Sequence, residues 1–583
     1  MSLDVRKWFR IYMNLILIKK IFFLIKKYNF FNFIKLITLI SFISFLDLFS
    51  IALVIPLIQV LKNEEFLKNI FHKSEFINNL PHNDQIYLAL LAMAIFFIIK
   101  FFLSVFLNYN QNRYISNMQA SVSSSLMFRY LSMEYKNYFN KSTSEFLRNI
   151  KDESSSFVFG VISPLITLII EISLFFGILI LFLFQFGLSV LFILFIFIIF
   201  LLGYILLTKK LIVRLGTDRF IFDEKIIKNT SELLKNIRNI KVHHLEDLCF
   251  RSYKRVLFLY ATSVKKHLTL QSLPRYSVEL LIILVFCSLI FSFTLEKKSF
   301  DDFIVSLGFL AAASFKLMPS INRIVVAQQT LRFHIPSIKI LYSEINKLHN
   351  NKLPNKKKIN FENNITLKNI NFAYSNKKVL NKLNLKINKG DKIGLIGKTG
   401  SGKSTLVDII AGLIILDSGK ILIDEKNINF KNYSWENNIG YVSQKAFILD
   451  DTLRNNINIY QSSKKSILID KKILNILQLV EMDDYLKDIK NNLDIQIGEN
   501  GIKLSGGQKQ RLSIARALYQ NPDLLIFDEA FSALDVNTEK KIIKNILNSF
   551  KSTTVVNISH KGYSFKMCDK IYILDNYKLK KIK

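Results

Sequence analysis

Residues Gly397 to Ser404 read GKTGSGKS, the stretch that decides the fold of the C-terminal part of this 583-residue chain. The spacing matches G-x-x-x-x-G-K-[ST], in which backbone N–H groups wrap phosphates, Lys403 faces the β and γ phosphates, and the Ser404 hydroxyl reaches Mg²⁺. A short apolar run, Asp391 to Gly397, precedes it, and Ser404 to Ile414 has apolar residues at helical spacing. The sequence therefore predicts a strand, a phosphate loop and a helix that bind ATP and Mg²⁺.

A second motif places two acidic residues at the end of an apolar run. LLIFDE, Leu524 to Glu529, runs four apolar residues into two carboxylates, and a parallel strand delivers such side chains at its carboxyl end, beside a phosphate loop. Asp528 is expected to hold the Mg²⁺ shell and Glu529 to polarise the attacking water. Gln444, the last residue of IGYVSQ, is expected to sense the metal and the γ-phosphate, and His560, after TTVVNIS, to contact the γ-phosphate.

These motifs, together with LSGGQ at Leu504 to Gln508, resemble the nucleotide-binding domain of ABC transporters. The resemblance covers roughly Phe361 to the C-terminus. It implies catalytic roles for Glu529, His560 and Gln444, and metal contacts from Ser404, Gln444 and Asp528. It implies nucleotide contacts from Tyr374, which would stack on adenine, and from Gly397, Lys398, Thr399, Gly400, Ser401, Gly402, Lys403, Ser404, Thr405, Ser505, Gly506, Gly507, Gln508 and Asp535. One departure is GENG at Gly498 to Gly501, where many exporters carry GERG, so Asn500 puts that contact with the membrane domain in doubt.

The composition points to a membrane-embedded first half. Half of the residues are hydrophobic, 51 are Phe, and the formal net charge is +34. The lysines are spread through loops and helix ends without one basic face or a base-stacking module, so we expect no nucleic-acid partner and ascribe the charge to the cytoplasmic side of a membrane. The three cysteines, at positions 249, 287 and 568, are too far apart for a metal site or a disulfide framework.

Six apolar stretches before residue 330 are each long enough to cross a hydrocarbon layer of ~30 Å at about 1.5 Å per residue. They are Phe30 to Leu61, Ile86 to Tyr109, Phe157 to Phe186, Leu188 to Thr208, Ser277 to Leu295 and Phe303 to Ala327. The long basic connections between them, Asn110 to Ser156 and Lys209 to Tyr276, place both termini in the cytoplasm. Residues near Tyr138 to Ile150 and Asn229 to Val242 are expected to couple the two halves.

The expected organisation has four parts. Residues 1–28 form an amphipathic helix along the inner membrane face, since the lysines interrupt the apolar run and no small-residue cleavage site marks a signal peptide. Residues 29–345 form an all-α transmembrane domain with six spans, 346–360 a linker, and 361–583 an α/β P-loop nucleotide-binding domain. This order resembles an ABC exporter half-transporter, which implies a homodimer in the bacterial inner membrane with its nucleotide-binding domains in the cytoplasm.

Four cations in or near the spans bear on the cargo. Lys100 and Lys316 lie at similar depths, each roughly 21 Å from the outer surface, and Arg275 and Arg323 form a lower tier near the inner face. In a homodimer these side chains are expected to surround a pathway for a phosphate-bearing headgroup. The alternative is pairing with Asp47, Glu171 or Glu279 in the same chain, or extension of the long side chains to the membrane surface.

The cargo prediction rests on a weaker resemblance in the membrane half. Ser44 to Ile58, Phe315 to Ile324 and a short external amphipathic helix near 64–80 resemble the bacterial lipid-linked oligosaccharide flippase of protein N-glycosylation. The external helix either packs on its own protein or offers a groove to a polyprenyl tail. The resemblance implies an anionic polyprenyl-pyrophosphate glycan flipped from the inner to the outer leaflet among membrane lipids. One alternative is export of a lipid A-type glycolipid, a peptide or another amphiphile. Another is a nonenzymatic binding or channel-regulating protein, in which nucleotide binding opens or closes a path without driving transport.

Overall fold

The computed structural model describes most of the chain. The described residues are 3–53, 56, 60, 81–139, 141–186, 190–296, 318–346, 356–374, 377–435, 438–459, 466–559 and 563–583. They divide into two compact units, one of residues Met1–Met133 with Lys141–Asn350, the other of Glu134–Asn140 with Asn351–Lys583. Each unit is described by itself.

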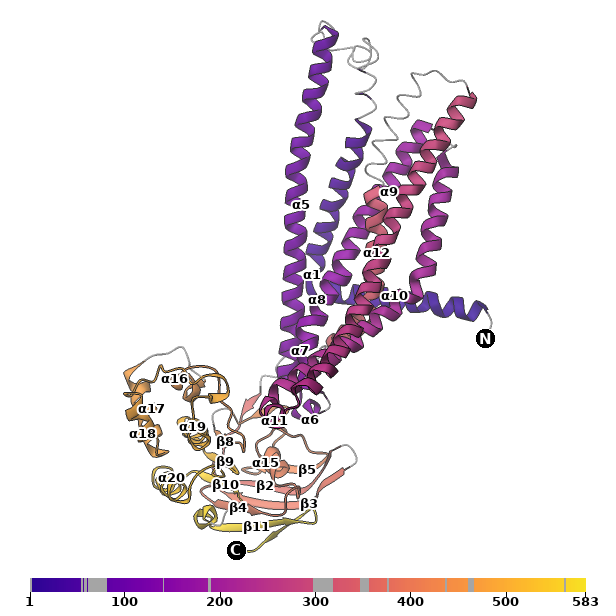
Figure 1. Ribbon diagram of the computed structural model, residues 1–583. Helices are drawn as coiled ribbons and strands as arrows, with labels where there is room; N and C mark the ends of the chain where they lie inside the picture. The colour runs from indigo at the N-terminus through magenta and orange to yellow at the C-terminus, as the bar shows by residue number, and fades with distance from the viewer. Residues whose placement is uncertain are drawn as a thin grey trace. The chain divides into compact units, whose positions relative to one another are not determined.

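The described residues of the first unit form helices joined by short turns, with no strand among them (Figure 1). Four helices are 46 residues or longer: α1 (Leu3–Ala52), α5 (His82–Ser132), α10 (Val190–Lys235) and α12 (Glu246–Glu296). The remaining helices are α7 (Thr143–Arg148), α8 (Ser154–Phe157), α9 (Ser163–Phe186), α11 (Ile237–Val242) and α14 (Ile335–Asn346), and residues 318–333 are also helical. Two π-helical turns, Asn149–Glu153 and Val158–Ile162, join α7, α8 and α9 into one run.

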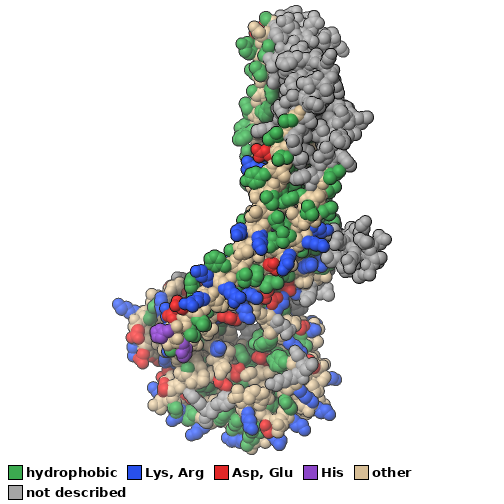
Figure 2. Space-filling model, turned by 45° about the vertical axis from the view of Figure 1, so that its right-hand side comes forward, with side chains coloured by type: hydrophobic (Ala, Val, Ile, Leu, Met, Phe, Trp, Pro, Cys, Tyr) green, Lys and Arg blue, Asp and Glu red, His purple; other side chains and the backbone are tan. Residues whose placement is uncertain are grey.

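Some of these helices are long and apolar enough to cross a membrane. Three described helical segments are long and apolar enough to span: Phe30–Ala52, Asn83–Ser132 and Thr143–Leu181. Each contains or overlaps one of the first three expected spans. The stretch Leu188 to Thr208 falls on α10 and Ser277 to Leu295 on α12, but part of each, and most of Phe303 to Ala327, lies outside the described side chains. Figure 2 shows hydrophobic side chains along the upper part of these helices in that view, and most of the Lys and Arg side chains toward their lower ends.

Close helix packing in this unit depends on glycine. A Cβ on Gly177 of α9 would lie 2.1 Å from a Leu48 methyl of α1, and a Cβ on Gly216 of α10 would lie 2.2 Å from the Phe333 carbonyl oxygen. These residues let the helices approach to distances that no other side chain permits. The buried residues between α1, α5, α9 and α14 form one apolar cluster that includes Leu126, Phe157 and Leu341.

The second unit carries two sheets and a helical region. A six-stranded sheet has the order β12-β11-β4-β10-β9-β8, and it is parallel except for the antiparallel edge pair β11 and β12. Its strands are β4 (Lys392–Ile396), β8 (Ile439–Val442), β9 (Leu524–Asp528), β10 (Thr554–Ile558), β11 (Lys570–Asp575) and β12 (Lys578–Lys581). β9 and β10 are buried along their whole length, as expected for the centre of a parallel sheet.

An antiparallel sheet packs on this core. Its order is β3-β2-β5-β6, with β2 (Asn364–Tyr374), β3 (Lys377–Asn388), β5 (Ser418–Ile423) and β6 (Lys426–Asn427), and β1 (Lys357–Lys358) pairs separately with β7 (Tyr433–Ser434). The helices are α6 (Tyr135–Tyr138), α15 (Lys403–Ile410), α16 (Leu453–Ile457), α17 (Ile467–Leu479), α18 (Asp483–Asp488), α19 (Gly506–Tyr519) and α20 (Val536–Ser549), with short 3₁₀ turns Glu499–Gly501 and η7 (Ser564–Met567). The predicted all-α domain followed by an α/β P-loop domain is confirmed.

Several expected boundaries coincide with elements or fall outside the described part. α1 runs without a break through residue 28, although Figure 1 draws its indigo N-terminal part across the direction of the rest. The expected linker at 346–360 lies largely in residues 347–355, which are outside the described residues, as is the expected external helix near 64–80. The first expected coupling region begins at the last residue of α6 and contains α7, and the second contains the end of α10 and α11.

Candidate functional site

The phosphate loop lies between β4 and α15. Lys403 is the first residue of α15, and its ammonium donates to the carbonyls of Gly397 at 2.8 Å and Lys398 at 3.0 Å. Burial lowers the pKa of Lys403, while the carboxylates of Glu529 and Asp528 oppose the shift. Gly402 caps the helix at φ 104°, and Gly400 has φ 81°, conformations that glycine adopts without strain.

The loop residues fit a polyphosphate. The Ser401 hydroxyl is buried and has no hydrogen-bond partner among the described residues, while the N-terminus of α15 directs free N–H groups into the same loop. A bound phosphate satisfies both, and Lys403 is already drawn onto the loop by two carbonyls. The loop residues Gly397 to Thr405 are therefore arranged as an ATP site requires.

The expected metal ligands come together at the end of β9. The Ser404 hydroxyl lies 3.5 Å from Oδ1 of Asp528, and the Tyr441 hydroxyl lies 3.5 Å from Oδ2 of the same carboxylate. Burial is the main cause of the raised pKa of Asp528. A hydroxyl and a carboxylate beside a phosphate loop are the oxygen ligands that Mg²⁺ takes in such sites, so the donor set fits the cofactor.

Gln444 and Glu529 meet across two neighbouring strands. The Gln444 amide donates to Oε2 of Glu529 at 2.7 Å, which links the loop after β8 to the residue that follows β9. Glu529 has φ 53°, an uncommon backbone conformation outside glycine, and its N–H donates to the Ile558 carbonyl at 2.9 Å. The side chain is thus held by both backbone and amide at the carboxyl edge of the sheet. His560 lies outside the described residues.

Tyr374 ends β2 within an aromatic group. Its ring contacts Phe372 edge-on at 4.9 Å between centroids and Phe139 at 5.8 Å. Burial raises the pKa of the Tyr374 hydroxyl, against a hydrogen bond with Thr405 of the phosphate loop. The tyrosine predicted to hold adenine is therefore tied to the loop predicted to hold phosphate.

Phe139 belongs to a short segment of the first half that lies in the second unit, Glu134–Asn140. Within this segment the Lys136 ammonium lies 5.1 Å from the Phe372 ring centroid and 3.5 Å from Asp417. Glu134 lies 3.6 Å from the Lys431 ammonium. The coupling segment expected near Tyr138 thus contacts the same strand that carries Tyr374.

LSGGQ forms the start of α19. The Ser505 hydroxyl accepts from the Gln508 N–H, and the Gln508 side chain accepts from the Ser505 N–H at 2.8 Å, a complete capping box. Among the described residues, no hydrogen bond or ion pair joins this motif to the phosphate loop. Ser505, Gly506, Gly507 and Gln508 therefore present a helix N-terminus that this chain's own phosphate loop does not use.

A residue that sequence reasoning missed supports the loop Ser532 to Asp535. Gln510 on α19 donates to the Ser532 hydroxyl at 2.9 Å and accepts from the Ala533 N–H at 2.8 Å. Its position two residues after LSGGQ is the only signal in the sequence. Asp535, predicted as a nucleotide contact, caps α20 by accepting from the N–H groups of Asn537 and Thr538, and the hydrogen bonds to Thr538 and Asn537 lower the pKa of its carboxyl group.

Asn500, the departure in GENG, has a local structural reason. Its φ is 52° inside the turn Glu499–Gly501, a left-handed conformation that asparagine tolerates better than most residues. Gly498 and Gly501 on either side also have positive φ, 82° and 65°.

The structure pairs two of the four predicted cargo cations with carboxylates of the same chain. Lys100 donates to Oδ1 of Asp47 at 2.6 Å and to the Ser50 hydroxyl at 2.8 Å, and is 8% exposed. Arg323 contacts Glu171 through two nitrogens, at 2.5 and 3.3 Å. These are pairings that the alternative interpretation named. Arg275 is exposed without an ion pair among the described residues, and Lys316 lies outside them.

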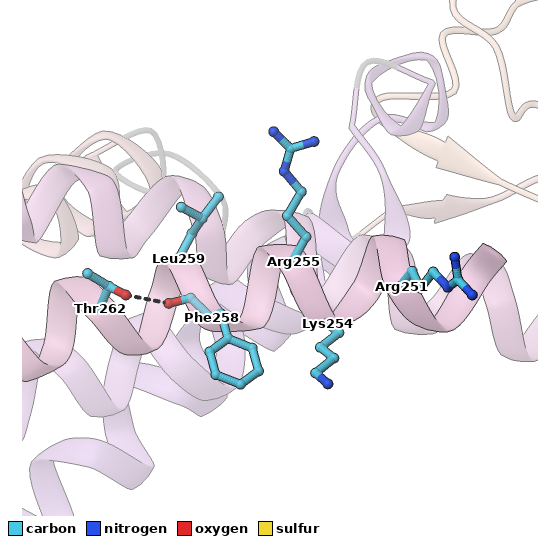
Figure 3. Close-up of a pocket in the computed structure, with 6 residues that line it drawn as sticks. All are labelled: Arg251, Lys254, Arg255, Phe258, Leu259 and Thr262. Atoms are coloured by element: carbon cyan, nitrogen blue, oxygen red, sulfur yellow. Dashed lines mark hydrogen bonds between the residues drawn. The ribbon is translucent and has the colours of Figure 1, made fainter. Parts of the chain in front are cut away.

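α12, in the first unit, carries basic and apolar side chains along a shallow hollow. A hollow of about 430 Å³ lies along this helix, lined by Arg251, Lys254, Arg255, Phe258, Leu259 and Thr262. In Figure 3 Arg255 and Leu259 point to one side of the helix, and Lys254 and Phe258 to the other. These side chains diverge, so the hollow does not form an enclosed site.

Comparison with known proteins agrees with the geometry of the second unit. Residues 380–532 match the family model of the ABC transporter. The chain is 33% identical over 285 residues to a putative export ATP-binding/permease protein of Rickettsia typhi, covering 48% of this chain and 47% of that protein. It is 36% identical over 218 residues to the ATP-dependent lipid A-core flippase of Francisella tularensis, covering 37% and 35%.

The matched regions thus span about half, or less, of the length of these relatives. The fold as a whole is similar to a solved structure of a bacterial Atm1-family ABC exporter with ATP bound. The TM-score is 0.76 at 19% identity, and the match covers 94% of each chain.

Proposed function

We propose that this chain, which has the fold of an ABC exporter half-transporter with an ABC-type ATP-binding domain, hydrolyses ATP in a pair of identical subunits to export an amphiphile. The contact between Gln444 and Glu529 carries this proposal. It holds a carboxylate at the carboxyl edge of the sheet, beside Asp528, Ser404 and the phosphate loop. Catalysis of phosphoryl transfer consists mainly of such positioning and charge stabilisation.

Each residue of the site has a defined task. Gly397 to Ser404 bind the phosphates, with Lys403 neutralising their charge. Asp528 and Ser404 would hold Mg²⁺, which would neutralise phosphate charge. Glu529 orients and polarises the attacking water, Gln444 keeps that carboxylate in place, and His560 contacts the γ-phosphate. Tyr374 stacks on adenine. The LSGGQ motif at the start of α19 serves the phosphate loop of the second subunit, since no hydrogen bond or ion pair in the described part of the chain joins it to its own loop.

We propose further that the cargo is an anionic lipid-linked glycan, moved from the inner to the outer leaflet of the bacterial inner membrane. Exposed Arg275 on α12 is available to a headgroup. Lys100 becomes available only when a phosphate replaces Asp47, because the two form a buried pair 2.6 Å apart. A doubly charged pyrophosphate competes for the ammonium better than a singly charged lipid phosphate does.

The test measures ATP hydrolysis and translocation by the purified full chain in vesicles. Three cargoes are compared: a polyprenyl-pyrophosphate glycan, lipid A and an apolar peptide. Stimulated hydrolysis with translocation of the first alone supports the proposed cargo, and translocation of lipid A or peptide alone replaces it with that alternative. Absence of ATP hydrolysis at every lipid composition contradicts the proposal as a whole.

The role of Lys100 needs a variant that leaves no unpaired carboxylate in the membrane. Lys100→Met with Asp47→Asn removes both charges, and Lys316→Met removes the second deep cation. We expect translocation of the glycan to be lost in the triple variant. Lys228→Met with Glu232→Gln removes an exposed ion pair of α10, 3.9 Å apart, and serves as the control. Unimpaired translocation in the triple variant would refute the cationic pathway while leaving the export function intact.

A further inference from the structure

The ATP-binding domain has a cavity that lies apart from the proposed ATP site and that the proposed function does not use. It has a volume of about 340 Å³ and lies between α20 and η7. Ile543, Leu547 and Met567 provide an apolar lining, and Ile543 and Met567 are buried. This volume is near the lower end of the range for small-molecule sites, roughly 300 to 1,000 Å³.

Four lysines surround this cavity. Lys540, Lys541 and Lys544 come from α20 and Lys566 from η7. Lys540 and Lys544 are one turn apart and share a helix face with Leu547. Such clustering of like charges is unfavourable unless an anion neutralises it.

One of these four lysines forms an ion pair with a carboxylate among the described residues. Glu481 lies 3.7 Å from the Lys541 ammonium, and it also accepts a hydrogen bond from Asn545 at 3.0 Å. Lys540, Lys544 and Lys566 have no ion pair in the described part of the chain. Three of the four lysines are therefore open to pairing with a bound anion.

Tyr563 places two of these lysines at the cavity. The Lys540 ammonium lies 5.1 Å from the centroid of its ring, and the Lys566 ammonium lies 5.3 Å from it. These cation–π contacts are weak enough for phosphate oxygens to replace them. The lysines can then turn to the anion, which leaves the aromatic ring and the apolar lining for an organic group.

We propose that this cavity binds a small soluble anion with two or more phosphate charges and a flat or apolar organic part, the class of a nucleoside di- or triphosphate. The site is separate from the phosphate loop, since the two share no residue. α20 begins at its cap Asp535, the last residue of the loop that Gln510 holds. An occupant of the cavity therefore bears on the helix that carries this loop.

The test measures equilibrium binding of radiolabelled inorganic pyrophosphate to the full chain with Lys403→Ala, which weakens binding at the phosphate loop. We expect one remaining saturable site per chain. In the same background, Lys540→Glu with Lys544→Glu should weaken that site about tenfold or more by reversing two charges at the cavity. Lys578→Glu with Lys580→Glu makes the same change in net charge on β12 and should leave binding unchanged.

The possible outcomes distinguish binding of pyrophosphate at this cavity from nonspecific attraction of the anion to a basic protein. Absence of the second site overturns the proposal, and equal losses in the two glutamate pairs overturn it as well. Lys540→Arg with Lys544→Arg should retain binding, and an unchanged unfolding temperature of the Lys540→Glu, Lys544→Glu variant excludes loss through misfolding. Competition by ATP but not by adenosine supports a nucleotide, whereas failure of ATP to compete limits the site to inorganic polyphosphate and overturns the stated class. This binding measurement requires neither hydrolysis nor transport. A failure to find the second site is therefore distinct from a failure of the proposed export function.

Discussion

Glu529 combines an unusual backbone conformation with a defined side-chain partner. Its φ of 53° follows a strand that is buried throughout, and its carboxylate accepts from Gln444. A residue held in a sparsely populated conformation at a strand end is common at catalytic sites, where the surrounding structure fixes it. The backbone thus favours the same role that the acidic pair in the sequence suggested.

Glu529→Gln should stop turnover and keep nucleotide binding. The amide retains the size of the side chain but cannot accept a proton from water, so we expect hydrolysis to fall about 10²-fold or more. Steady-state hydrolysis and binding of labelled ATP are measured on the same preparation. Glu425→Gln, at an exposed turn, is the control. Undiminished hydrolysis in Glu529→Gln would remove its assignment as the water-activating residue. Absence of hydrolysis in the unaltered chain, with nucleotide binding intact, would favour the nonenzymatic alternative.

Asp408 on α15 should make the ATP-binding domain less stable at neutral pH. Burial raises its pKa to about 6, from 3.8, with Asp528 adding to the shift. The folded state therefore binds this proton more tightly than the unfolded state, and stability declines as pH rises from about 3.8 to 6. Asp408→Asn should raise the unfolding temperature at pH 7.5, and the gain should shrink as the pH is lowered toward 4. A gain that is constant with pH would contradict this cause.

Asp424 provides a control of opposite sign. Burial works against the shift, but hydrogen bonds from the N–H groups of Glu362, Asn364 and Asn363 lower its pKa. Its stabilising effect is present at neutral pH and is lost as pH falls through the folded pKa. Asp424→Asn should therefore lower the unfolding temperature at pH 7.5.

The sequence was sufficient to predict which side chains meet near the carboxyl ends of the parallel strands. Asp528, Ser404, Gln444 and Glu529 could be placed because parallel strands deliver their following residues to one edge. Lys100 could not be placed, since the choice between Asp47 and a headgroup depends on helix rotation that spacing does not define. The capping role of Asp535 was also hidden, because the same side chain suits a helix cap and a nucleotide contact.

Helix packing in the first unit depends on positions where a side chain is absent. Gly216 lets the Phe333 carbonyl approach α10, whereas Gly203 on the same helix has nothing within 4 Å of an added Cβ. Their neighbours in the sequence do not distinguish them. The two π-helical turns before α9 were equally unpredictable, because hydrophobic periodicity does not reveal one inserted residue.

Gly216→Ala should destabilise the helical unit. The new methyl meets backbone rather than a movable side chain, so α10 must shift, at a cost of about 1–3 kcal/mol. The unfolding temperature in detergent measures the loss. Gly203→Ala should cost nothing, since its surroundings are open and alanine favours the helix. Equal effects of the two substitutions would contradict the packing argument.

The whole molecule works, in our proposal, as two copies whose nucleotide sites are completed across the pair. The two-domain order was predictable from apolar spans followed by the phosphate-loop motif, and the fold comparison bears it out. The cargo was not predictable to the same degree, because relatives with different named functions match this chain over less than half of its length.

Shared sites predict complementation between inactive chains. Lys403→Ala damages the phosphate loop and Ser505→Arg blocks the start of α19, so each variant alone should lack hydrolysis. When both are coexpressed, a mixed pair contains one intact site, and about a quarter of the wild-type sites should return with random pairing. Steady-state hydrolysis of the purified mixture, compared with each variant alone, measures the recovery. No recovery in mixed pairs isolated by two affinity tags would contradict the shared-site arrangement.

The grouping of Glu134–Asn140 with the ATP-binding domain has a practical consequence. A recombinant fragment beginning after residue 350 lacks Phe139 and Lys136, so it uncovers the edge of Tyr374, the face of Phe372 and the carboxylate of Asp417. Such a truncated protein would show altered nucleotide affinity for a reason unrelated to catalysis. A synthetic heptapeptide with the sequence of residues 134–140, added in trans or fused through a flexible tether, would refill that surface.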